Sequence, residues 1–240
     1  ALTAAVRRAG GGAAWFERQL SPDSVPDPAA GPALRGWWSG LSRSPQSLWE
    51  RQDAGIEGGW EVMADYQRWL LVRRIVTQRP VLELMTEFWE NHLNVPVTGH
   101  AQFPHRVSYG EAVRRNALGR FDELLLDAIT HPAMLIYLDG AVSTKAHPNE
   151  NLGRELLELH TVGRGNYDEA DVKSSARILT GWMVDLWDTW VPSYSTADHW
   201  TGPVSVMGFQ DAHARGDGRD LTRRHLTYLP HHPATARRID

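Results

Sequence analysis

The sequence predicts a mostly α-helical protein, a single multi-helix globular domain with a long irregular loop region towards its C-terminus. Apolar residues recur at intervals of three and four in several segments, which is the spacing of an amphipathic helix. Prolines, asparagines and aspartates lie where those segments begin or end, as helix starts and stops require. The length of 240 residues is within the range of one large domain, so we expect residues 1–240 to form one unit.

Four elements are expected in the first hundred residues. A helix is predicted at residues 1–20, with a break at Gly10 to Gly12. A loop rich in proline, aspartate and alanine is predicted at residues 21–32. Residues 60–78 predict a core helix. Residues 80–94 predict a further helix that has proline in its first turn.

The helix at residues 80–94 has two faces when its residues are placed at steps of about 100°. One face is apolar and is expected to point inward, and it carries Val81, Met85, Phe88, Trp89 and His92. The other face carries Glu83, Glu87 and Glu90, and we expect these glutamates to be solvated.

Helices are also predicted at residues 111–129 and 132–138, the second ending at Gly140, where glycine can take a left-handed conformation. The next predicted helix starts at Asn149 or Asn151 and runs to Gly163. Its apolar stripe is Leu152, Leu156 and Leu159.

Asp168 is a predicted N-cap for a helix at residues 169–182. Residues 183–219 are rich in Trp, Pro, Gly, Ser, Asp and His and show no sustained period. We expect a long ordered loop region there, with room for one short hairpin.

Composition removes several classes of function. The absence of cysteine excludes disulfides, thiolate zinc sites and cysteine nucleophiles. A net charge of -4 without a basic stripe argues against nucleic acid as a partner. The longest apolar runs are far below the roughly 20 residues of a membrane-spanning helix. No Gly-rich phosphate loop, HExxH zinc motif or GxSxG elbow occurs in the chain.

The most unusual local feature is a polar stripe beside the apolar face of the helix that follows Asn149. Asn151, Glu155 and Glu158 are spaced i, i+4 and i+7, so they lie along one flank of that helix. A carboxylate beside apolar residues must be paired, protonated or metal-bound, and we expect Glu155 to be mostly buried. The candidate catalytic residues are therefore Glu155, His92 and Glu158.

Each candidate has a structural alternative. His92 could be a buried histidine that is hydrogen-bonded to a backbone carbonyl. Glu158 could pair with Arg154 on the helix surface.

A divalent metal ion is a second hypothesis for the same region. Asp139, Asn149, Asn151 and Glu155 would offer oxygen ligands of the kind that Ca²⁺ or Mg²⁺ prefers, although a turn and two helix caps are the preferred explanation of the first three. His199 is a loop histidine that could reach a cleft, and zinc binding by histidines stays open. The candidate metal ligands are Glu90, His92, Asp139, Asn151, Glu155 and His199. The remaining histidines considered, namely His213, His225, His231 and His232, are expected at the surface.

Four motifs resemble the bacterial family DUF1800, a domain of unknown function. They lie at residues 87–92, 134–139, 148–159 and 166–172, and their order and spacing are also similar. The family pattern usually has histidine where this sequence has Glu90, so a metal site here would need glutamate as the ligand. Related sequences continue beyond the position of Asp240, and we expect a trimmed domain that is also shortened near Gly10.

The resemblance implies export, to the periplasm or the extracellular space, often with a twin-arginine-type signal. It also implies a possible partner protein from a second uncharacterised family that resembles sulfatases. It implies no established reaction.

Two functions from different classes remain after this reasoning. The first is a carboxylate- or metal-dependent hydrolase that acts on an extracellular or cell-envelope substrate. The alternative is a non-catalytic surface or assembly protein that binds its partner through exposed tryptophans, of which the chain has eleven.

Overall fold

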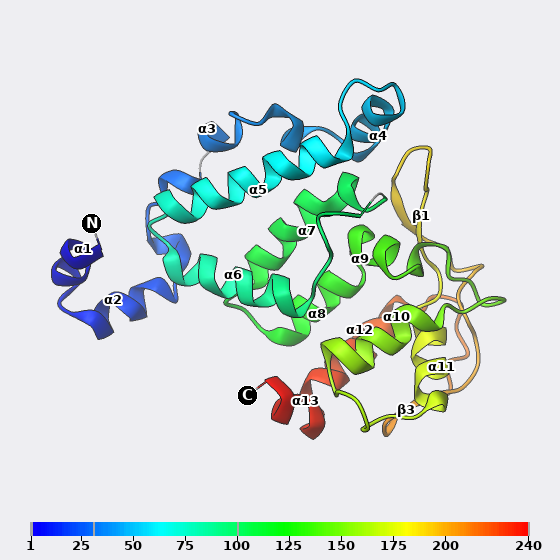
Figure 1. Ribbon diagram of the computed structural model, residues 1–240. Helices are drawn as coiled ribbons and strands as arrows, with labels where there is room; N and C mark the ends of the chain where they lie inside the picture. Colours follow the sequence, from blue (N-terminus) through cyan, green and yellow to red (C-terminus); the bar gives the residue numbers. More distant parts are fainter. Residues whose placement is uncertain (1, 31, 100, 240) are drawn as a thin grey trace.

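Helices carry nearly all the regular structure in the computed structural model, which describes residues 2–30, 32–99 and 101–239. The prediction of a mostly α-helical domain is confirmed. In Figure 1 the N-terminal helices extend from the left along the top of the view, the last helices lie in its lower half, and the hairpins lie on its right side. None of the helices in the described ranges is both long and apolar enough to span a bilayer.

The described part of the chain up to residue 92 is mainly helical. Their bounds are α1 Leu2–Ala9, α2 Gly12–Gln19, α3 Pro32–Arg35, α4 Pro45–Asp53, α5 Gly59–Val76 and α6 Pro80–His92. Gly10 and Gly11 adopt positive φ angles of 94° and 122°, which L side chains rarely adopt, and so they separate α1 from α2 as predicted. Short 3₁₀ turns occur at Pro22–Ser24, Pro28–Ala30 and Ser39–Ser42.

The described chain after residue 92 carries further helices. They are α7 Phe103–Asn116, α8 Phe121–Ile129, α9 Pro132–Tyr137, α10 Glu150–Glu155, a π-helix at Leu156–His160, α11 Glu169–Ile178, α12 Arg219–Tyr228 and α13 Pro233–Ile239, with 3₁₀ turns at Gly140–Val142 and Leu229–His231. The prediction of one helix over residues 111–129 is wrong, because the chain turns between Asn116 and Phe121. Gly119 lies in this turn and its amide donates to the carbonyl of Asn116.

Residues 183–219 contain two antiparallel hairpins joined by turns and loops, where the sequence predicts a loop region with room for one hairpin. Strand β1, Trp182–Val184, pairs with β2, Pro192–Tyr194, and β3, Val204–Val206, pairs with β4, Phe209–Asp211. Each strand has three residues, which is too short to show an alternating pattern. Strand β3 packs against α11, and Asp171 of that helix accepts a hydrogen bond from the amide of Met207 at 2.8 Å.

Helix α6 has its most buried face where the sequence predicts a solvated one. Glu83 and Glu90 are only 4% and 8% exposed, whereas Phe88 is 46% exposed. The prediction that these two glutamates are solvated is therefore wrong. Their burial is possible because arginines from the neighbouring helices meet them, and the periodicity of α6 alone does not reveal those partners.

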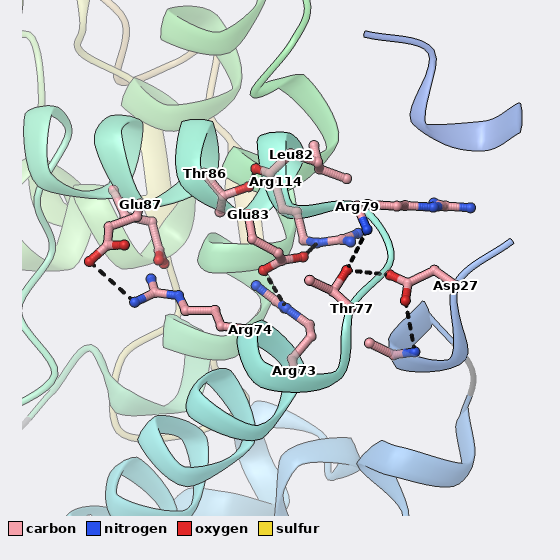
Figure 2. A network of polar contacts seen from close by, with 12 residues as sticks. Asp27, Arg73, Arg74, Thr77, Arg79, Leu82, Glu83, Thr86, Glu87 and Arg114 are labelled. Atoms are coloured by element: carbon pink, nitrogen blue, oxygen red, sulfur yellow. Dashed lines mark hydrogen bonds and ion pairs between the residues drawn. The ribbon is translucent and has the colours of Figure 1, made fainter. Parts of the chain in front are cut away.

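Glu83 bridges the two helices that flank α6 (Figure 2). One carboxylate oxygen accepts from Nε of Arg73 on α5 at 2.8 Å, and the other accepts from Nε of Arg114 on α7 at 2.7 Å. Farther along α6, Glu87 pairs with Arg74 at 3.2 Å but is about half exposed. Glu83 therefore holds three helices together from inside, whereas Glu87 lies at the edge.

Glu90 forms a second buried ion pair farther along α6. Its Oε1 accepts from Nη2 of Arg106 at 3.0 Å and from the hydroxyl of Tyr66 at 3.2 Å. Arg106 also donates through Nε to the carbonyl of Val95 at 2.8 Å. Gly110 of α7 leaves the space for this cluster, because a Cβ there would lie 1.9 Å from the Tyr66 hydroxyl and 2.8 Å from Glu90.

Removing the charge of Glu83 should destabilise the protein. We expect Glu83→Gln to lower the free energy of unfolding by about 3 to 5 kcal/mol, because it leaves Arg73 buried without its counter-ion. Glu87→Gln on the same helix is the matched control and should change it by less than about 1 kcal/mol. Urea denaturation of both variants measures the difference, and equal effects would contradict the structural role assigned to Glu83.

A side chain at position 110 should disturb the second ion pair. We expect Gly110→Ala to lower the free energy of unfolding by about 1 to 3 kcal/mol, since the added methyl must displace Tyr66 or Glu90. Gly12→Ala is the control, because a Cβ added there would meet nothing within 4 Å and the residue starts α2. A thermal melt in which both variants behave alike would show that the cluster tolerates the methyl group.

Candidate functional site

The helix that carries Glu155 begins as predicted. Asn149 is its N-cap, and the side-chain oxygen of Asn149 accepts from the amide of Asn151 at 2.7 Å. Gly153 allows α10 to approach α11 closely, because a Cβ there would lie 2.8 Å from the backbone nitrogen of Ala176. The start of α10 is therefore held firmly against the core.

The helix then widens into the π-helix at Leu156–His160, which changes the face that each side chain presents. Leu157 is fully buried and Leu159 is 48% exposed. The predicted apolar stripe through Leu159 is therefore wrong, because it assumed an α-helical period up to Gly163. The π-helix also buries His160 against the end of α6.

His92 and His160 form a reciprocal pair. Nε2 of His92 lies 3.0 Å from the carbonyl oxygen of His160, and Nδ1 of His160 lies 3.1 Å from the carbonyl oxygen of His92. A carbonyl can only accept, so each of these ring nitrogens carries the proton. The other nitrogen of each neutral ring, Nδ1 of His92 and Nε2 of His160, consequently keeps its lone pair.

Both imidazoles are held neutral. The pKa of His160 is lowered to about 4, mainly by burial, with smaller contributions from His92 and from the positive charge of Arg238. Burial likewise lowers the pKa of His92, and Arg238 again adds to the effect. At neutral pH the pair can therefore accept hydrogen bonds through its free lone pairs, but it does not carry charge.

Glu155 is the carboxylate beside this pair. It is half-buried rather than mostly buried, and among the described residues its side chain makes no hydrogen bond or ion pair. Burial raises the pKa of its carboxyl group, and the negative charge of Glu158 raises it further. Glu155 is thus a more basic carboxylate than an exposed glutamate.

These residues line one pocket of about 500 Å³, which we call the Glu155 pocket. Its lining residues are Asn91, His92, Asn94, Tyr137, Leu138, Asn151, Glu155, Leu159, His160 and Arg238. Three amides, two neutral imidazoles, one carboxylate and one guanidinium therefore face the same space. Such a mixture can bind a polar molecule and move a proton to or from it.

Glu158 does not share this pocket. Its carboxylate pairs with Arg164 and accepts from the Tyr167 hydroxyl at 2.5 Å, and these bonds lower its pKa. The alternative predicted from the sequence, an ion pair between Glu158 and Arg154, is wrong. Arg154 instead donates to Glu169 at 2.7 and 2.8 Å. The geometry gives no support to a catalytic role for Glu158 beside Glu155.

The structure does not assemble the predicted metal ligands. His92, Asn151 and Glu155 meet in the Glu155 pocket, but Glu90 is bound to Arg106 on the opposite side of α6. Within residues 2–30, 32–99 and 101–239, no group of three histidine, aspartate or glutamate side chains has an arrangement that could hold a metal ion.

Asp139 and His199 lie elsewhere. Asp139 is exposed and itself takes the left-handed conformation expected of Gly140, with φ of 58°, while its carbonyl accepts from the side chain of Asn149. His199 is buried beside the second hairpin, where its Nε2 lies 2.8 Å from Nε2 of His213. The oxygen cluster predicted around Asp139 is therefore a turn and a helix cap.

Two histidines that were expected at the surface are buried. His213 is 6% exposed because it pairs with His199, and His225 on α12 is fully buried near the hydroxyl of Ser175. His231 is exposed, as predicted, and His232 is half-buried.

Sequence reasoning missed five polar residues of the site, namely Asn91, Asn94, Tyr137, His160 and Arg238. His160 follows Glu155 by five positions, and a helix of α-helical period gives no reason to place it opposite His92. Tyr137 and Arg238 come from α9 and α13, so only the tertiary fold brings them to the pocket. The one local signal was the unusual density of polar residues between Asn149 and His160.

The lowered pKa of His160 predicts how the stability of the protein depends on pH. Because folding lowers the pKa of His160 to about 4, from a usual value near 6.5, the folded state binds fewer protons than the unfolded state between those values. Stability should therefore fall as the pH drops through this window. NMR of the ring nitrogens should show protons on Nε2 of His92 and Nδ1 of His160, and a His160 that titrates above pH 6 would contradict the assignment.

Comparison with known proteins agrees with the motifs. No curated protein and no solved structure matches the chain. One family model does match, over residues 2–240, and its description is "Protein of unknown function (DUF1800)". This match covers the pocket and every element that supports it, and the chain therefore belongs to the DUF1800 family.

Proposed function

We propose that this protein is a hydrolase in which Glu155 is the general base and the Glu155 pocket binds the substrate. The observation that supports the proposal is that the carboxylate of Glu155 has no counter-ion among the described residues. Glu83, Glu90 and Glu158 are each tied to an arginine, whereas Glu155 has no partner among the described residues and lies in a polar pocket. A half-buried carboxylate without a counter-ion costs stability, which is a frequent feature of active sites.

Glu155 suits proton abstraction from water. Its raised pKa makes it a better proton acceptor than an ordinary glutamate. The lone pairs of His92 and His160 can orient a water molecule or a substrate hydroxyl by accepting hydrogen bonds. In this scheme Glu155 takes a proton from the water as the water oxygen bonds to the electrophilic atom of the substrate. The bond to the leaving group then breaks, and protonated Glu155 returns the proton to the leaving group.

Arg238 and the amides supply the complementary charge. Hydrolysis develops negative charge on the oxygen of the attacked group, and a guanidinium in a half-enclosed pocket stabilises that charge. Asn91, Asn94 and Asn151 carry amide N–H groups that can donate to the same oxygen or fix the substrate's orientation.

The proposal includes an extracellular or cell-envelope substrate and export of the protein. This part rests on the family resemblance of the four motifs and on no feature of the pocket.

A second candidate, a non-catalytic interaction protein, is favoured by one observation. Trp37 and Trp60 are 73% and 76% exposed, which is unusual for so large an apolar side chain. If a partner covers them, Trp60→Ala should abolish its binding while leaving the pocket intact.

The test of the hydrolase proposal is Glu155→Gln. We expect at least a 100-fold loss of hydrolysis of cell-envelope preparations or of p-nitrophenyl esters and glycosides, because the amide cannot accept the proton of water. The melting temperature should hold or rise, since the carboxylate has no partner to lose. Glu150→Gln is the matched control on the same helix, because Glu150 lies outside the pocket and should retain full activity.

Two results would contradict the proposal. One is a Glu155→Gln protein as active as the wild type. The other is a wild-type protein that releases no product from any of these substrates, together with a carboxyl pKa for Glu155 that NMR finds unshifted.

A further inference from the structure

A second pocket, of about 500 Å³, adjoins the Glu155 pocket and differs from it in charge. The two pockets share Leu159 and Arg238, so a single ligand can extend from one into the other. The exposure of Leu159 follows from the π-helix, which turns this side chain out between the two spaces. We call the second space the arginine pocket, after Arg164, Arg237 and Arg238 in its lining.

The charges of the arginine pocket do not cancel. Glu158 is the carboxylate in its lining, and Arg164 already neutralises it. Arg237 and Arg238 form no ion pair with a carboxylate among the described residues, although Arg238 donates to the carbonyl of Glu158. Two positive charges therefore remain at one side of a concave surface.

Arg238 also connects this charge to the proposed reaction centre. Its positive charge acts on both His92 and His160, which places the guanidinium close to the histidine pair. The side chain of Arg238 also packs over Gly163, where a Cβ would lie 3.2 Å from its Cδ. It therefore lies at the boundary between the two pockets.

We propose that the arginine pocket binds an acidic group, a carboxylate or a phosphate, on the part of the substrate that extends beyond the bond to be cleaved. Guanidinium groups bind both acids through paired N–H donors, and a concave site with two of them favours an anion over a neutral group. This inference rests on the proposed function, because it defines the arginine pocket as part of the same substrate site. It makes the substrate of the hydrolase an anionic molecule.

Anion binding can be measured without turnover. The full chain is titrated with inorganic phosphate and, separately, with acetate, and the backbone amides of Gly163 and Asn166 are followed by NMR. We expect saturable shifts confined to the arginine pocket with at least one of the two anions. Tighter binding of phosphate would identify a phosphorylated substrate, and equal or tighter binding of acetate would identify a carboxylated one.

The variant Arg237→Gln tests whether the arginine pocket is where the anion binds. We expect this variant to weaken the anion about three- to tenfold, because one charge-assisted contact is lost at a partly exposed site. Arg223→Gln is the matched control, since Arg223 is exposed on α12 and lines neither pocket, and it should change the affinity less than about twofold. The side chain of Arg237 makes no hydrogen bond within the described part of the chain, so the melting temperature of the Arg237→Gln protein should equal that of the wild type.

Two outcomes would overturn the inference. The first is no saturable shift with either anion. The second is an equal loss of affinity in Arg237→Gln and Arg223→Gln, which would show general attraction to a basic surface. Glu155→Gln should keep the anion affinity, so a failure of the hydrolase assay and a failure of the anion titration are separate results.

Discussion

The buried ion pairs of α6 are the constraint on which the rest of the molecule depends. Glu83 joins α6 to α5 and α7 through Arg73 and Arg114, and Glu90 repeats the arrangement with Arg106. Ion pairs that are taken out of water gain little net stability, but the loss of one partner is costly, so such pairs fix which residues meet. The rotation of α6 about its axis is set in this way. Because Glu83 and Glu90 must face the arginines, His92 at the end of the same helix faces the other way, towards the π-helix.

The reciprocal histidine pair then fixes how the second helix meets the first. Each imidazole donates to the other residue's carbonyl, so the two hydrogen bonds also satisfy backbone groups at the end of α6 and at the end of the π-helix. Continuation of α10 as an α-helix would turn His160 to a different angle, away from this reciprocal pairing. The π-helix therefore sets the pairing of the two histidines. That pairing in turn leaves one lone pair free on each ring, in the pocket that Glu155 also lines.

The sequence allowed the helical fold and the polarity of the site to be predicted, but not its assembly. Caps such as Asn149 and breaks such as Gly10 and Gly11 are local signals, and they were predicted correctly because their physics involves only neighbouring residues. The burial of Glu83 and Glu90 depends on arginines that are 10 to 31 residues away, so a helical projection assigned them to solvent. No feature of the composition signals the change from α- to π-helix after Glu155. This change exposes the side chain of Leu159 to solvent and buries that of His160. Arg238 could be placed only by the packing of α13.

The contrast among the glutamates is the strongest argument that the Glu155 pocket has a function. Where this fold buries a carboxylate for structural reasons, it supplies an arginine, as it does for Glu83 and Glu90, and it ties Glu158 to Arg164 even near the surface. Arg238 lies close enough to Glu155 to line the same pocket, yet no ion pair joins the two among the described residues. A guanidinium and a carboxylate that face one space without neutralising each other are both available to a third molecule. An anionic substrate would complete this arrangement, because its acid group would bind beside Arg237 in the arginine pocket, while Arg238 and the carboxylate of Glu155 face the bond to be cleaved.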